Sequence, residues 1–126
     1  MRIVIADDST LIRNRLQDVL LSFDQVEIVG TCTNGTDTLK ALQTLNPDLA
    51  IIDIKMPGLS GLEVLKEIRK VNKTLQIIIL TFYGSEYYRQ KAIEGGANYF
   101  FSKVDDFEKV EKVVNEMLKL TVNQTI

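Results

Sequence analysis

Three carboxylates stand directly after two apolar segments of the chain. Asp7 and Asp8 follow the apolar residues 3–6, and Asp53 follows the apolar residues 49–52. Such runs are typical of buried parallel strands, and open α/β sheets bind their ligands outside the carboxyl ends of the strands. If the two strands are neighbours, the negative charges converge and repel one another unless a divalent cation lies among them. The residues therefore predict a hard-metal site and phosphoryl chemistry.

Two further segments end in groups that suit the same chemistry. An apolar segment at 75–81 ends with Thr81, and an aromatic segment at 99–101 leads through Ser102 to Lys103. An Asp carboxylate can act as a nucleophile and form an aspartyl-phosphate. Mg²⁺ takes carboxylate and water oxygens, while lysine and threonine can pair with phosphate oxygens. Catalysis of phosphoryl transfer consists mostly of such positioning and charge neutralisation.

Each of these residues also has an ordinary structural interpretation. Asp8 or Ser9 can cap a helix, and Asp53 can end a strand in solvent. Thr81 and Lys103 are residue types that commonly serve as a structural hydroxyl and a solvent-facing charge. The specific signal is their joint placement at the ends of four predicted strands.

The whole sequence alternates strand and helix patterns. Strands are predicted at 2–6, 26–30, 49–53, 75–81 and 99–101. Helices with apolar stripes are predicted at 12–23, 39–45, 62–68 and 107–118, and a short helix capped by Ser85 is predicted to end at Gly95-Gly96. Residues 1–120 are predicted to form one domain, and 121–126 a frayed C-terminal tail.

This alternation predicts the α/β fold class, as a single flavodoxin-like (βα)5 domain. Its five-stranded parallel sheet would carry helices on both faces. The flavodoxin-like strand order 2-1-3-4-5 would bring Asp7 and Asp8 next to Asp53. Periodicity alone does not give that order.

Composition excludes several classes of function. The chain of 126 residues has a net charge of −2, so direct binding of nucleic acid or an anionic membrane is not expected. It has no His and a single Cys, Cys32, which excludes an internal disulfide and is predicted to be an inert apolar residue at a strand end. No signal peptide or transmembrane pattern is visible, and the cytoplasm is the predicted compartment.

Over nearly its whole length, the chain resembles the receiver domain of two-component response regulators. The resemblance rests on residues with the spacing of that family: Asp7-Asp8, Asp53 followed by Lys55-Met56-Pro57-Gly58-Leu59-Ser60-Gly61, Thr81, and Gly96-Ala97 through Phe100 to Lys103.

The resemblance implies a role for each position. Asp53 would be the phosphoacceptor, supplied by a sensor histidine kinase or a phosphotransfer protein. Asp8, Asp53 and the backbone carbonyl of Lys55 would bind Mg²⁺, and Asp7 would hold the metal through water. Lys103 and Thr81 would contact the phosphoryl oxygens.

The resemblance also implies a switch. Thr81 and the aromatic Phe100 would transmit phosphorylation to the surface of the fourth helix, fifth strand and fifth helix, where a downstream protein or output domain reads it and a dimer can form. Such a chain is not an enzyme in the usual sense: it catalyses its own phosphotransfer and autodephosphorylation.

Three residues depart from the family pattern. Val104 replaces the usual Pro after the lysine, and a non-Pro cis bond costs about 2.5–4 kcal/mol, so we expect a trans peptide or a strained loop beside Lys103. Phe100 replaces the commoner Tyr and is expected to stay buried. Phe82 replaces a small residue and is expected to narrow access to Asp53, slowing phosphotransfer relative to Phe82→Ala.

Residues near the acceptor admit two interpretations each. Lys55 can shield or clamp a phosphoryl group, or it can be a solvated lysine. Tyr83, Tyr87 and Tyr88 suit a protein contact surface, although packing is an equally good role for at least one of them.

Two other functions fit these residues less well than a receiver does. A Mg²⁺-dependent phosphatase would carry its second Asp two residues after the nucleophile, whereas Asp7-Asp8 are adjacent and followed by Ser9. A flavodoxin-like cofactor binder would need a phosphate-cradling loop after the first strand, where the chain has carboxylates. Within the receiver interpretation, a stand-alone protein and a receiver cut from a longer DNA-binding regulator both remain open.

Overall fold

A computed structural model describes the backbone of residues 1–125 and the side chains of residues 1–120. Strands and helices alternate along the chain, as predicted. The strands are β1 (Arg2–Ala6), β2 (Glu27–Cys32), β3 (Leu49–Ile52), β4 (Gln76–Thr81) and β5 (Tyr99–Ser102). The helices are α1 (Thr10–Leu20), α2 (Gly35–Thr44), α3 (Gly61–Arg69), α4 (Glu86–Glu94) and α5 (Phe107–Thr125).

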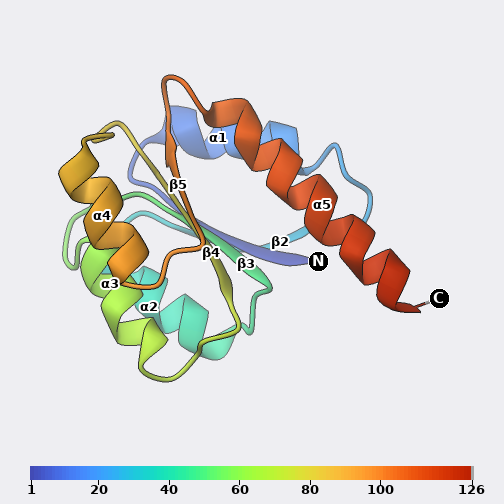
Figure 1. Cartoon of the computed structure of the whole chain (residues 1–126), viewed down its shortest axis with the longest axis horizontal. Coiled ribbons are helices and arrows are strands. Elements are labelled where there is room, and N and C mark those ends of the chain that lie inside the picture. The colour runs from blue at the N-terminus through green and yellow to red at the C-terminus, as the bar shows by residue number, and fades with distance from the viewer. Residues whose placement is uncertain (126) are drawn as a thin grey trace.

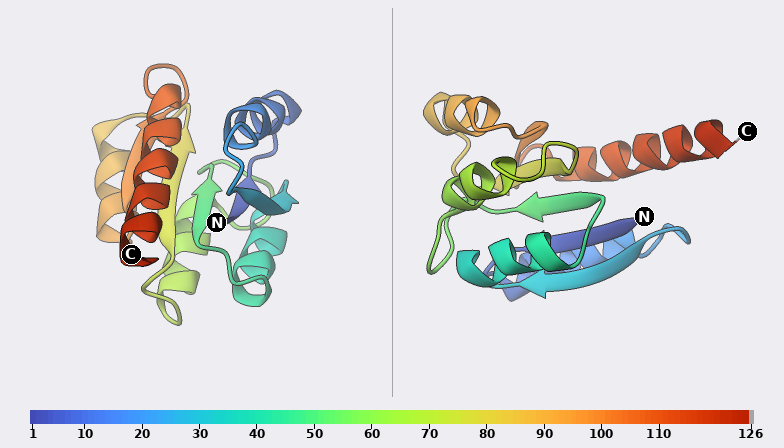
Figure 2. Two further views of the ribbon diagram at one scale, coloured as in Figure 1. Left: turned by 90° about the vertical axis from the view of Figure 1, so that its right-hand side faces the viewer. Right: turned by 90° about the horizontal axis from the view of Figure 1, so that it is seen from below.

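The five strands form one parallel sheet in the order β2-β1-β3-β4-β5, which confirms the flavodoxin-like prediction. Helices α1 and α5 cover one face of the sheet, and α2, α3 and α4 cover the other (Figures 1 and 2). β1 and β3 are direct neighbours, so the segments that end in aspartates lie side by side.

Two apolar cores lie on the two faces of the sheet, because successive side chains of a strand point to opposite sides. Ile3 and Ile5 of β1 pack with α1 and α5, whereas Val4 and Ala6 pack with α2, α3 and α4. A sheet covered on both faces explains why its strands read as unbroken apolar runs.

Polar caps set the starts of four helices. The side chains of Ser9, Asn34, Ser60 and Ser85 each accept a backbone N–H from the first turn of α1, α2, α3 and α4 respectively. α4 ends at Gly95-Gly96 as predicted, with Gly96 at φ +105°.

Three predicted boundaries need correction. β2 is displaced toward Cys32, whose backbone pairs with Ala6, so the buried Cys32 ends that strand. α1 ends at Leu20, before Phe23. α5 continues to Thr125, through residues 121–125 of the predicted tail, because extending an existing helix adds a hydrogen bond for each residue fixed.

Residue 126, also assigned to the tail, lies outside the described residues. The domain boundary at 120 stays a prediction. Among the described helices, none has both the length and the apolar character needed to cross a membrane.

Candidate functional site

The predicted acidic cluster forms at the carboxyl edge of the sheet. Ala6 of β1 pairs with Ile52 of β3, so Asp7 and Asp53 leave the two strands at the same level. Carboxylate oxygens of Asp7, Asp8 and Asp53 lie within 4.8 Å of one another. Asp7 and Asp53 are buried, whereas Asp8 is exposed. The cluster therefore has two carboxylates inside the edge and one that faces solvent.

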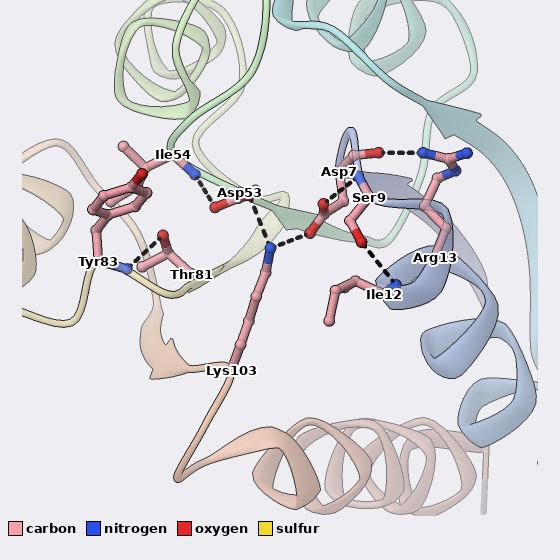
Figure 3. A network of polar contacts seen from close by, with 9 residues as sticks. All are labelled: Asp7, Ser9, Ile12, Arg13, Asp53, Ile54, Thr81, Tyr83 and Lys103. Carbon is pink, nitrogen blue, oxygen red and sulfur yellow. Dashed lines mark hydrogen bonds and ion pairs between the residues drawn. The ribbon is translucent and has the colours of Figure 1, made fainter.

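Lys103 lies between the two buried carboxylates. Its Nζ is 2.6 Å from Asp7 Oδ2 and 2.9 Å from Asp53 Oδ2 (Figure 3). Lys103 is only 4% exposed, so the interpretation of this residue as a solvent-facing charge is excluded. Register explains its position: Thr81 pairs with Ser102, and Lys103 is the next residue beyond the end of β5.

Burial and the contacts between charged groups shift the pKa values of Asp7 and Lys103 in opposite directions. Burial raises the pKa of Asp7 above its ordinary value, although the hydrogen bonds from Lys103 and from the Ser9 backbone oppose the shift. Burial alone would lower the pKa of Lys103, but its hydrogen bonds to Asp7 and Asp53 outweigh burial, and the pKa is raised. The lysine therefore stays charged and balances the acids beside it.

The corner between β1 and α1 fixes the direction of Asp7. Ser9 donates its backbone N–H to Asp7 Oδ1 at 2.9 Å, and its own hydroxyl caps α1 by accepting the N–H of Ile12 at 3.3 Å. Arg13, one helical turn further, donates from Nη1 to the carbonyl oxygen of Asp7 at 2.8 Å (Figure 3). This carbonyl belongs to the peptide that joins Asp7 to Asp8, so Arg13 fixes the link between the two acids.

The loop after Asp53 is held at several points. Asp53 Oδ1 accepts the backbone N–H of Ile54 at 2.7 Å, and the Ile54 carbonyl accepts the N–H of Gly61 at 2.8 Å. The carbonyl of Pro57 accepts the N–H of Gly35, at the start of α2, at 3.0 Å. A Cβ on Gly61 would overlap the carbonyl oxygen of Asp53, so this position requires glycine.

Thr81 and Phe100 stand where the resemblance places a switch. Thr81 is fully buried, and its Oγ1 accepts the backbone N–H of Tyr83 at 3.1 Å. Phe100 is 3% exposed, so its ring lies inside the molecule in this structure. That agrees with the expectation of an inward ring, while the persistence of this state stays a prediction.

Phe82 borders the site. Its ring lies 4.8 Å from Lys103 Nζ, measured to the ring centroid, and the residue is 59% exposed. The peptide after Lys103 is trans, like every other peptide bond of the described residues, which decides between the two expectations for Val104. Lys103 donates its backbone N–H to the carbonyl of Thr81 at 2.9 Å, which ties its loop to β4.

Comparison with known proteins adds the family. The sequence profile of the response regulator receiver domain matches residues 3–115. The chain belongs to the response regulator receiver domain family. This receiver is 37% identical, over 96% of its length, to a protein-glutamate methylesterase/protein-glutamine glutaminase of Carboxydothermus hydrogenoformans, of which it covers 36%. It thus spans about a third of the length of the curated relatives it matches. A second such relative comes from Clostridium acetobutylicum.

Solved structures agree with the fold. The receiver superposes on the response regulator domain of Thermotoga maritima CheB with a TM-score of 0.82 and 28% identity, covering 98% of this chain and 96% of the other. A LuxR-family DNA-binding response regulator from Staphylococcus aureus gives a TM-score of 0.84 and 31% identity, covering 91% and 96% of the two chains. Similar receivers therefore occur in proteins with different outputs.

The donor set of the receiver suits a hard cation. Carboxylate oxygens that converge at one edge, with one acid open to solvent, are ligands that Mg²⁺ accepts together with water and phosphate oxygens. The backbone carbonyl of Lys55 lies in the loop anchored by Gly35 and Gly61, two residues after Asp53. The residues present are compatible with the magnesium site that the sequence predicts.

Sequence reasoning missed two contacts of the receiver. It did not anticipate that Lys103 pairs with Asp7 as well as Asp53, or that Arg13 binds the Asp7 carbonyl. The second contact had a signal, because Arg13 follows the helix cap Ser9 by one turn and can reach back to the loop. The Lys55 side chain lies over the rings of Tyr83 and Tyr88, a contact that neither interpretation of the sequence included.

Proposed function

We propose that this receiver accepts a phosphoryl group on Asp53 from a sensor histidine kinase or phosphotransfer protein and thereby controls a partner. The observation that supports this proposal most directly is the pairing of Asp53 Oδ2 with Lys103 at 2.9 Å, beside Asp7 and Asp8 at the open edge of the sheet. A nucleophilic carboxylate is thus placed next to a fixed cation and further acids that can bind a metal.

In the proposed transfer, an oxygen of Asp53 attacks the phosphorus of a phosphohistidine. The new P–O bond forms as the P–N bond breaks, and the imidazole leaves neutral because its other nitrogen carries the proton. Lys103 neutralises charge on the phosphoryl oxygens, and Thr81 donates its hydroxyl to one of them. With acetyl phosphate as donor, a P–O bond breaks and acetate leaves.

Magnesium is the proposed cofactor. Asp8, Asp53 and the Lys55 carbonyl would bind it directly, and Asp7 would hold it through water. A bound divalent cation supplies charge neutralisation for the transferring oxygens. Arg13 and Ser9 keep the two acids of the β1–α1 corner directed at this position.

The reverse of activation is hydrolysis. Water attacks phosphorus, the bond to Asp53 breaks, and inorganic phosphate leaves with release of a proton. The chain is therefore proposed as a phosphoacceptor switch with self-catalysed transfer and dephosphorylation. The methylesterase activity named for its relatives is not transferred to this chain, which covers 36% of the first of them.

The proposed output is a change in the surface formed by α4, β5 and α5. A downstream protein or an attached output domain would read it, and a dimer formed on phosphorylation is compatible with it. Attachment to an output domain is supported by the relatives, which are longer proteins. We propose that the receiver makes no direct contact with nucleic acid or membrane. We also propose the cytoplasm as its compartment.

Incubation with acetyl phosphate, with and without Mg²⁺, followed by intact-mass measurement tests the proposal. One phosphoryl adduct is expected, only with Mg²⁺, and Asp53→Asn should abolish it. Asp8→Ala should lower both its rate and its Mg²⁺ dependence. Asp18→Asn, which alters an exposed acid of α1, is the matched control and should keep the adduct. An adduct that persists in Asp53→Asn would refute the assignment.

The same assay tests whether the Phe82 ring limits access to Asp53. Because its ring borders Lys103, we expect Phe82→Ala to be phosphorylated faster than the parent chain. Equal rates would show that the ring does not limit access to Asp53.

A further inference from the structure

Two groups beside Asp53 converge on one residue, Tyr83. Thr81 Oγ1 accepts the Tyr83 backbone N–H at 3.1 Å. The Lys55 ammonium lies over the Tyr83 ring, 5.2 Å from its centroid, and over the Tyr88 ring at 5.5 Å. Tyr83 is therefore held by a hydroxyl from the end of β4 and by a cation from the loop after Asp53.

The rings continue from this point onto α4. Tyr83 meets Tyr88 edge to face with centroids 6.1 Å apart, and Tyr88 meets Tyr87 in the same way at 5.4 Å. Lys91 lies over Tyr87, 5.7 Å from its centroid. These residues form a ladder of rings and cations, here called the tyrosine ladder, that leads from the acceptor loop along the first turns of α4.

Apart from the partly buried Tyr88, which packs against the core, and Arg89, whose guanidinium lies 5.0 Å from the Phe100 ring centroid, few contacts hold the N-terminal end of α4. Ala92, near the C-terminal end, is the one buried residue of the helix, while Tyr87 and Phe82 are exposed. Phe100 is already inside, so its entry into the molecule is not available as the first response to phosphorylation from this state. The tyrosine ladder is the contact that can still change.

We propose that Lys55 is a second phosphoryl-binding cation and that phosphorylation releases Tyr83 from both of its holds at once. The proposal rests on the proposed phosphorylation of Asp53. A phosphoryl group brings negative charge and three acceptor oxygens to a position beside Thr81 and two residues from Lys55. A charge-assisted hydrogen bond is stronger than an exposed cation–π contact, so the ammonium leaves the rings.

Release of Tyr83 frees the N-terminal end of α4 while its C-terminal end stays in place. Arg69 of α3 donates to the Gly96 carbonyl and to Asn98 Oδ1, both at 3.0 Å, just beyond α4. Helix α4 is thus held at its C-terminal end by Arg69. Its N-terminal end is held through Tyr83 only as long as Tyr83 keeps its contacts with Thr81 and Lys55. Movement of the free end changes the α4–β5–α5 surface without a rearrangement of α3.

Fluorine NMR of protein labelled with 3-fluorotyrosine tests this proposal, because the chain has only four tyrosines and each signal can be assigned by a Tyr→Phe substitution. In the parent chain with Mg²⁺ and acetyl phosphate, the Tyr83 and Tyr88 resonances should shift and that of Tyr99, on β5, should not. In Lys55→Met without donor, the Tyr83 and Tyr88 resonances should already be displaced toward those positions.

Lys91→Met is the matched control, since it removes the same kind of cation from the same ladder but should displace only Tyr87. Intact mass measured on each sample separates the two proposals. An adduct with unmoved Tyr83 and Tyr88 resonances would overturn the release while leaving the proposed function intact. Absence of the adduct would overturn both. Unmoved resonances in unphosphorylated Lys55→Met would overturn the hold by Lys55 whatever the mass shows.

Discussion

Two neighbouring arms leave the acidic edge of the sheet, and they are held very differently. The first runs from Asp53 through α3, and four residues of that helix are buried: Gly61, Val64, Leu65 and Ile68. The second runs from Thr81 through α4, which buries only Ala92. The first arm carries the acceptor and is fixed to the core by four buried residues, whereas the second packs against the core through Ala92 and the partly buried Tyr88.

This difference gives the two arms different roles. The α3 arm is a fixed scaffold, and the α4 arm is the part that can respond to phosphorylation. Segments with few buried apolar contacts open at a lower free-energy cost than core elements. Coupling between a modified site and a distant surface is typically about 1–3 kcal/mol, which can shift a loosely held arm but not a helix packed into the core. Phosphorylation of Asp53 should therefore change the α4 arm and leave the α3 arm in place.

The largest expected contrast comes from one apolar truncation in each helix. Leu65→Ala in α3 should lower the free energy of unfolding by about 2–5 kcal/mol, because it leaves a cavity in the core. Ile93→Ala in α4 removes a side chain that is about half exposed, and should cost about 0.5 kcal/mol or less. Urea unfolding measures both. Similar losses would erase the distinction between the two arms.

Two glycines sharpen the contrast at the level of the loops. Gly61→Ala should destabilise the protein by about 1–3 kcal/mol, since its Cβ meets the Asp53 carbonyl. Gly84→Ala, in the β4–α4 loop, places its Cβ no closer than 3.8 Å to a neighbour, and should be neutral or slightly stabilising. Thermal unfolding of the two variants compares them directly. A destabilising Gly84→Ala would show that the second loop is as confined as the first.

Substitution of Arg69 tests how the C-terminal end of α4 is held. Its guanidinium also donates to the Asn72 carbonyl at 3.1 Å, and burial lowers its pKa. Arg69→Gln should cost about 1–3 kcal/mol by leaving acceptors unpaired, and should speed amide hydrogen exchange around residues 95–98. Arg69→Lys keeps the charge but not the planar fork, so it should restore little. Full recovery by lysine would mean that charge alone holds this end.

The smallest expected effect on stability comes from Asp106, in the loop between β5 and α5, which is the third loop at this edge of the sheet. Its pKa is lowered by the hydrogen bond from the Ser102 backbone and by Lys109. Because the folded-state pKa lies below the ordinary value of 3.8, the ionised side chain adds stability above that pH, which is lost as the pH falls through the folded-state pKa. The stability advantage over Asp106→Asn should thus shrink in acid.

Urea unfolding between neutral pH and acid measures that difference. Asp105→Asn, which removes one negative charge at the adjacent exposed position, is the control. An advantage of the parent chain over Asp106→Asn that grows as the pH falls would contradict the assignment.

The sequence could predict the parts of this molecule that local chemistry decides. Unbroken apolar runs mark strands buried on both faces, and Ser85 at a helix start marks a cap, so β1, β3 and α4 lie close to where their residues indicate. Aspartates after such runs then had to lie at the carboxyl edge. Strand order required the family resemblance, because periodicity does not record which strands are neighbours.

Tertiary contacts account for what the sequence could not predict. That Lys103 pairs with both Asp7 and Asp53, and that Lys55 turns to Tyr83, depends on how separate loops meet. The end of α5 was placed too early because no breaker in 119–125 distinguishes a continuing helix from a fraying one.

Peptide-resolved hydrogen exchange in Mg²⁺, with and without acetyl phosphate, tests the central claim most directly. With donor, exchange should change in residues 82–90 and stay the same in 61–69, and Asp53→Asn should show no change in either segment. An equal response of both segments, or one that persists in Asp53→Asn, would contradict the claim that phosphorylated Asp53 acts through the α4 arm on a fixed α3 scaffold.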